Sequence, residues 1–137
     1  MSNRTLGDCI NNQKLISVLS SVSVLEAAKL MAAKKCGSLL VVSKTQALVG
    51  IFTERDLLSK VVVNEMDPAI TRVSNVMTAT PRTAPSSMPV SHVPLLMRDG
   101  GFRHLPVLGD DGAVLGVFSM RDSLASELID ADQITNH

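Results

Sequence analysis

Residues 50–58 read GIFTERDLL, and residues 116–124 read GVFSMRDSL. Both strings place Gly, an apolar residue, Phe, a hydroxyl residue, Arg and Asp in the same order. An apolar stretch that runs into Thr or Ser predicts a strand followed by a helix, because hydroxyl side chains favour helix starts. The hydroxyl, guanidinium and carboxylate would also gather where that helix begins. The string therefore has a chemical interpretation beside the structural one.

The two strings belong to a longer duplication. They lie 66 residues apart, and this offset aligns residues 20–58 with residues 86–124 without a gap, with thirteen identities in 39 positions. Upstream, TLGDCINNQKLISV aligns with RVSNVMTATPRTA after a shift of about one residue. The sequence therefore predicts two repeats, residues 1–65 and 66–137, each too small to bury a large core alone.

Local signals in the first repeat predict a strand, a helix, two strands and a second helix. A leading strand is expected near residues 15–18. Ser23 and Glu26 form the sequence pattern of a capping box, and Gly37 is suited to end the helix that follows. The apolar segments SLLVV and ALVGIF, separated by SKTQ, then predict two strands before the helix that opens at Thr53.

The second repeat shows the same order with two local changes. Asp111-Gly112 predicts a tight turn between its two central strands. Pro94 predicts a first helix that begins later than its counterpart, with its cap at Ser91, because proline is tolerated only in the first helical turn. The predicted fold class is therefore α/β (α+β), with two pseudo-symmetric β-α-β-β-α repeats packed sheet to sheet.

Composition excludes several classes of partner. The 137 residues carry 13 basic and 13 acidic side chains, and only 2% are aromatic, which argues against a nucleic-acid partner. The apolar runs are too short to span a membrane, and the polar N-terminus lacks the core of a signal peptide. Cys9 and Cys36 form no disulfide or metal-binding pattern. We therefore expect a cytoplasmic protein without a metal site.

The repeated hydroxyl and carboxylate have a structural interpretation. Thr53 with Asp56, and Ser119 with Asp122, have the spacing of capping boxes. This interpretation explains the hydroxyls better than the carboxylates, since Glu or Gln suits the reach back to the cap. The chain itself uses Glu26 in that position elsewhere.

The same side chains also suit a ligand. A carboxylate can accept hydrogen bonds from both hydroxyls of a ribose diol. A helix start with a Thr or Ser hydroxyl suits a phosphate group, whose charge Arg55 or Arg121 would neutralise. Both interpretations remain open on the residues alone.

The chain resembles a tandem pair of CBS domains, also known as a Bateman module. The resemblance rests on NVMTATPRT, on RHLPVLGDDGAVLGVFSMRD and on the counterpart GSLLVVSKTQALVGIFTERD, and it extends from about residue 6 to residue 129. Members of the family are commonly regulatory sensors of adenosine-containing ligands such as AMP, ADP, ATP, NAD or S-adenosylmethionine. The resemblance implies a homodimeric regulatory protein without a required cofactor, which acts on an unidentified protein.

The resemblance also implies where the ligand binds. In the family, the hydroxyl and Asp of the repeated string contact phosphate and ribose in a cleft between the repeats. On this basis Asp56 would act with the Thr80 segment, and Asp122 with the Lys14–Ile16 segment. The candidate ligand-binding residues are Thr53, Arg55, Asp56, Thr80, Arg103, His104, Ser119, Arg121 and Asp122.

Only the second repeat carries a basic pair, Arg103 and His104, at a position where the family often places phosphate-binding residues. We therefore expect the Asp122 site to bind phosphate-bearing ligands more tightly. The alternative for this pair is a solvated position at the start of a strand.

Two other function classes remain. One is a structural dimerisation module with vestigial ligand sites, for which Leu57, Val61, Leu124 and Leu128 are the expected interface residues. The other is a small enzyme, which we do not favour because no nucleophile–base pair, paired carboxylates or metal-ligand cluster stands out. The glycines near residues 109–116 lack the spacing and the Lys of a phosphate-binding loop and indicate a hairpin instead.

Overall fold

The structure is a computed structural model that describes residues 4–11 and 13–119. The chain divides into two compact units. One unit is Ile16–Pro81, and the other combines Met1–Leu15 with Arg82–His137. Units and sequence repeats therefore divide the chain at different residues, because a unit is held by contacts and a repeat by sequence identity.

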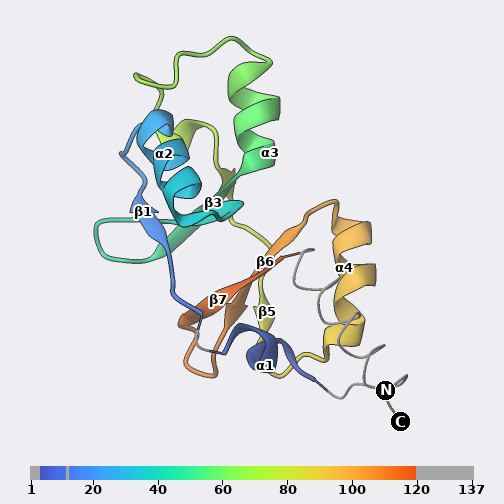
Figure 1. Ribbon diagram of the computed structural model, residues 1–137. Coiled ribbons are helices and arrows are strands. Elements are labelled where there is room, and N and C mark those ends of the chain that lie inside the picture. Colours follow the sequence, from blue (N-terminus) through green and yellow to red (C-terminus); the bar gives the residue numbers. More distant parts are fainter. Residues whose placement is uncertain (1–3, 12, 120–137) are drawn as a thin grey trace. The chain divides into compact units, whose positions relative to one another are not determined.

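The Ile16–Pro81 unit contains a four-stranded sheet in the order β1-β2-β3-β4. The strands are β1 Ser17–Leu19, β2 Ser38–Val42, β3 Leu48–Thr53 and β4 Thr78–Ala79. β1 runs parallel to β2, and the other neighbours are antiparallel. Helix α2, Val24–Lys34, joins β1 to β2, while α3, Glu54–Asp56, follows β3 and continues as a π-helical segment, Leu57–Val62 (Figure 1). The order predicted for the first repeat is confirmed.

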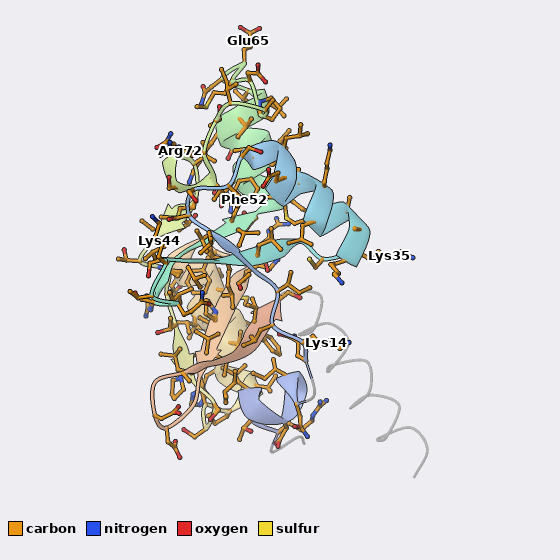
Figure 2. The ribbon with its side chains drawn as sticks, turned by 90° about the vertical axis from the view of Figure 1, so that its left-hand side faces the viewer. Lys14, Lys35, Lys44, Phe52, Glu65 and Arg72 are labelled. Atoms are coloured by element: carbon orange, nitrogen blue, oxygen red, sulfur yellow. The ribbon has the colours of Figure 1, made fainter. Side chains whose placement is uncertain are left out.

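One face of this sheet forms the core of the unit. Leu39, Val41 and Phe52 pack with residues of α2 and with Val61 of the π-helical segment. Figure 2 shows Phe52 enclosed in the unit, whereas Lys35 and Lys44 project from its surface. Because alternate strand residues face opposite sides of a sheet, Leu39 and Val41 both point towards the helices.

Helix α2 begins as expected and ends differently. The Ser23 hydroxyl accepts the Glu26 N–H at 3.1 Å, as an N-cap should. At the other end Lys35 adopts a left-handed conformation with φ 55°, and the Cys36 N–H donates to the Met31 carbonyl at 3.1 Å. Gly37 therefore does not end the helix, because Lys35 closes it two residues earlier.

The second unit contains a three-stranded sheet in the order β5-β6-β7. The strands are β5 Ala84–Pro85, β6 His104–Leu108 and β7 Val114–Ser119, and its helices are α1 Leu6–Ile10 and α4 Val93–Gly100. β5 is parallel to β6, and β6 is antiparallel to β7. Its buried core is formed by Leu6, Ile10, Ala84, Val93, Met97, Leu105, Val107 and Phe118. The second helix expected for this repeat lies outside the described residues.

The late start of the first helix in the second repeat is confirmed. A 3-10 turn, Val90–His92, precedes α4, and Pro94 lies in the first turn of the α-helix. The residue at the N-cap is His92 rather than Ser91, and it makes no side-chain capping bond. Pro94 is tolerated there because the first-turn N–H groups have no acceptor within the helix.

The strand registers confirm the duplication. Leu39 pairs with Phe52, and Leu105 pairs with Phe118, at the same offset of 66 residues. The irregularity after Val41 in β2 recurs after Val107 in β6. The identities in the sequence therefore correspond to identical strand pairing.

The leading segment of each repeat belongs to the unit that the other repeat forms. The Leu6 N–H donates to the Met88 carbonyl at 2.9 Å, and the Val73 N–H donates to the Val22 carbonyl at 2.8 Å. Leu6 lies at the start of the first repeat and bonds to Met88 of the second, whereas Val73 lies near the start of the second repeat and bonds to Val22 of the first. The donors are 67 residues apart and the acceptors 66, so the shift of one residue in the sequence alignment is present in the structure.

Candidate functional site

The hydroxyl and the carboxylate of the first string form a complete capping box at the start of α3. The Asp56 N–H donates to the Thr53 hydroxyl at 3.1 Å, and the Thr53 N–H donates to Asp56 Oδ2 at 3.1 Å. Thr5 and Asp8 form the same box at the start of α1. The expectation that Asp suits this box poorly is therefore wrong: in the first helical turn the short Asp side chain reaches the N-cap N–H.

The capping box at the start of α1 changes the pKa of Asp8. The backbone N–H of Thr5, with a further contribution from its hydroxyl, lowers the pKa of Asp8 below its ordinary value. A carboxyl whose pKa is lowered by folding stabilises the fold above its unfolded pKa, and this contribution is lost as the pH falls through the lowered pKa. The box at α1 therefore weakens in acid.

The Asp56 carboxylate is engaged by two further side chains. The Thr78 hydroxyl on β4 lies 3.2 Å from Oδ1 and 3.4 Å from Oδ2, and Lys60 Nζ lies 3.0 Å from Oδ1. Lys60 also donates to the Met77 carbonyl at 3.4 Å. Asp56 is only 5% exposed. The carboxylate thus connects the end of β3, the helical segment and the strand β4.

Sequence reasoning missed Thr78 and Lys60. Lys60 stands four residues after Asp56, a spacing at which opposite charges meet on a helix. Thr78 lies within the NVMTATPRT segment, but its approach to Asp56 depends on β4 pairing with β3, which a local pattern does not reveal. The first of these two signals was available in the sequence.

The glycine of the repeated string permits this approach. A Cβ on Gly50 would lie 2.9 Å from the Thr78 carbonyl oxygen and 2.5 Å from Met77 Sδ. A Cβ on Gly116, its counterpart, would lie 2.6 Å from Gln13 Oε1. In both units glycine therefore leaves room for the segment that covers the outer edge of the strand.

Thr80 and Arg55 are both exposed in the Ile16–Pro81 unit. Thr80 has φ 44°, and its hydroxyl donates to the Ala79 carbonyl at 2.8 Å. The segment expected beside Asp56 is thus present, but Thr78 rather than Thr80 makes the contact. At the helix start, the Glu54 N–H donates to the Gly37 carbonyl at 3.0 Å. With the Asp56 N–H on Thr53, two first-turn amides already have protein acceptors, which reduces what this helix start offers a phosphate.

The structure brings three candidates of the second repeat to one end of its sheet. His104 opens β6 and pairs in register with Ser119, which closes β7, while the exposed Arg103 directly precedes His104. Arg121 and Asp122 lie outside the described residues, as do Leu124 and Leu128. In the other unit the residues paired at the same place are Ser38 and Thr53, without a basic side chain.

Three further features concern residues 4–11 and 13–119 alone. Within these ranges no helix has the length and apolarity needed to cross a membrane. No group of three or more His, Cys, Asp or Glu side chains there is placed to hold a metal ion. Cys9 and Cys36 are not disulfide-bonded.

The family model and the solved structures that match this chain all point to the same family. The CBS domain matches residues 6–63 and 73–122 of this chain. A solved structure described as a putative signal-transduction protein with CBS domains from Burkholderia ambifaria is 36% identical, covers 92% of this chain and 95% of its own, and superimposes with a TM-score of 0.85. The solved structure of CBSX2 in complex with AMP is 27% identical over 93% of this chain and 98% of its own, with a TM-score of 0.76.

Curated relatives include proteins similar to this chain over most of its length, although this chain spans different shares of their lengths. An uncharacterized 17.7 kDa protein of Acidianus ambivalens is 34% identical over 88% of this chain and 71% of its own length. The mitochondrial CBS-domain protein CBSX3 of Arabidopsis thaliana is 36% identical over 73% of this chain, which spans only 50% of that relative. Both the sequence match and the fold are those of a tandem CBS pair, and this chain belongs to the CBS-domain family.

Proposed function

We propose that this CBS pair is a regulatory module that binds an adenosine-containing ligand and acts on another protein. The observation that carries the proposal is the string of hydroxyl, Arg and Asp, present in both repeats of a family in which CBSX2 has been solved with AMP. The CBS match takes up most of the chain, which favours binding over catalysis. Two cysteines outside any disulfide suit a reducing compartment such as the cytoplasm.

The candidate residues have distinct roles in this proposal. Asp56 and Asp122 would accept the hydroxyls of the ribose, since a carboxylate accepts two such bonds at once. Thr53 and Ser119 would donate their hydroxyl protons to phosphate or sugar oxygens. Arg55, Arg103, Arg121 and His104 would neutralise phosphate charge. Thr80 would line the base.

A panel of ligands tests the proposal. Thermal unfolding of the unmodified protein with AMP, ADP, ATP, NAD, S-adenosylmethionine or GTP should show a rise in midpoint for at least one adenosine compound. A ligand at a hundredfold excess over its dissociation constant adds about 2.7 kcal/mol to the free energy of unfolding. D122A should weaken that ligand about tenfold or more in titration calorimetry. If no adenosine compound shifts the midpoint, the chain is not such a sensor.

One observation favours a second candidate, a structural dimerisation module with vestigial sites. The Asp56 carboxylate already has donors from Thr53, Thr78 and Lys60, as a purely structural residue would. The expected interface needs one correction: Val61 is 1% exposed and belongs to the core, so it is unavailable to a partner. On the same segment Leu58 and Val62 are 61% and 60% exposed, and they take its place in the proposed homodimer.

Sedimentation of an L58E/V62E variant tests the dimer. The unmodified protein should sediment as a dimer at micromolar concentration, and the variant should sediment as a folded monomer, because two buried carboxylates are costly in an apolar contact. S59A, an exposed change on the same segment, is the matched control. A monomeric unmodified protein would contradict the homodimer.

A further inference from the structure

The Asp56 carboxylate has nearly used its capacity to accept hydrogen bonds. A carboxylate offers about four lone-pair positions. The Thr53 N–H, the Thr78 hydroxyl and the Lys60 ammonium take three of them, at distances between 3.0 and 3.4 Å. A ribose diol presents two hydroxyl donors. One of the three present donors must therefore leave before both hydroxyls of a diol can bind.

The three donors differ in how easily they move. The Thr53 N–H is a backbone group fixed by the capping box with Asp56. The Thr78 hydroxyl stands on β4, whose backbone is paired with β3. The Lys60 side chain is 41% exposed and ends a flexible stem of four carbons, so its ammonium can move into water at the smallest cost.

We propose that Lys60 is a specificity-determining residue of the Asp56 site, which makes this site prefer phosphate-bearing adenosine ligands to adenosine itself. The inference rests on the proposed function and adds the ligand class of one site. A diol that takes Asp56 Oδ1 separates a partly buried ion pair. The released ammonium remains tethered beside the carboxylate, and an anionic group on the ligand restores its partner, whereas a neutral nucleoside does not.

The duplication does not extend to Lys60. The residue 66 positions after Lys60 is Ser126, which carries no charge. The repeat offset therefore places no ammonium at the position equivalent to Lys60, and the proposed selectivity is assigned to the Asp56 site.

The test compares AMP with adenosine by titration calorimetry in a D122A background, which leaves the Asp56 site to be measured. The ratio of the two affinities is determined for Lys60, K60M and K60R. K60M keeps the length of the apolar stem without the charge, and K60R keeps the charge. K44M removes a lysine from the turn after β2, at the far end of the hairpin from Thr53, and is the matched control for net charge.

K60M should lower the ratio of AMP to adenosine affinity about tenfold or more, mainly because adenosine binds more tightly once it displaces no ammonium. K60R and K44M should keep the ratio within about threefold of the parent, since a charged hydrogen bond is retained or untouched. An unchanged ratio in K60M overturns the inference and leaves the proposed function standing. Loss of all binding in D122A does the same, because the Asp56 site then takes no ligand. Absence of binding even in the unmodified protein overturns both.

Discussion

The outer edges of β3 and β7 occupy equivalent positions in the two units, yet they are covered differently. On β3, the backbone of β4 pairs with Gly50 and Ile51. On β7, the side chain of Gln13 makes both bonds to Val117: Nε2 donates to the carbonyl at 3.1 Å, and Oε1 accepts the N–H at 2.7 Å. Val117 corresponds to Ile51 at the repeat offset. On β7 the Gln13 side chain thus makes the edge contacts that the short strand β4 makes on β3.

The difference shows which features a duplicated fold must keep. The glycine is present in both copies because both coverings approach the strand closely. The covering itself is free to change, provided that the polar groups of the strand edge obtain partners. The residue paired with Asp56 is not part of the duplication, since the sequence has Ser126 at the position equivalent to Lys60.

The largest expected effect tests whether the two cores are equivalent. Phe52 and Phe118 are both fully buried at matching positions. F52A and F118A should each lower the free energy of unfolding by about 3–5 kcal/mol, because each leaves a cavity in a closed core. Urea unfolding followed by circular dichroism measures both losses. A loss below about 1 kcal/mol in one variant only would show that the two cores are not equivalent.

The next effect separates the two glycines. In G50A the new methyl group meets Met77 Sδ and also the Thr78 backbone carbonyl, whereas in G116A it meets only side-chain atoms, of Gln13 and Ile10. We expect G50A to lose about 2–3 kcal/mol and G116A about 1 kcal/mol in urea unfolding, because backbone yields less easily than a side chain. Equal losses would contradict the proposed difference between the two edges.

A smaller effect concerns Gln13 itself. Q13A should lower the free energy of unfolding by about 1 kcal/mol, since water can replace part of its two bonds at an exposed edge. Q13E can accept the Val117 N–H but cannot donate to the carbonyl, so it should lose an intermediate amount. Hydrogen exchange of the Val117 amide should be faster in Q13A. An unchanged rate would mean that Gln13 does not protect this edge.

The smallest effect compares the ends of α2 and α4. Both helices end on a residue in the left-handed conformation: Lys35 with φ 55° ends α2, and Gly101 with φ 70° ends α4. K35G should raise the free energy of unfolding by about 0.5 kcal/mol, and G101A should lower it by about 1 kcal/mol, because only glycine adopts this conformation without strain. Thermal unfolding of both variants measures the two changes in the free energy of unfolding. Destabilisation by K35G would show that the Lys35 side chain stabilises the helix end in another way.

Much of each repeat could be predicted locally. The strands β2 and β3, the N-cap at Ser23 and the late start of α4 follow from apolar periodicity, capping residues and Pro94. Local patterns predict the structure less well where one conformation competes with another. Gly37 was available to end α2, yet Lys35 adopts the left-handed conformation first. The usual preference for Glu or Gln in a capping box disfavours Asp56, yet the first helical turn brings its carboxylate to the Thr53 N–H.

The duplication, its offset and the order of elements in the first repeat follow from the sequence alone, because identities and local preferences are carried by near neighbours in the chain. Helix α1 and the His92 N-cap of α4 do not follow from it. The folded chain is needed to show that the leading segment of each repeat pairs with the other repeat, that Thr78 reaches Asp56, and that Gln13 covers β7. These contacts join residues far apart in the sequence or depend on the approach of one segment to another. No local preference specifies them, and they form where exposed strand edges and a buried carboxylate must obtain hydrogen-bond partners.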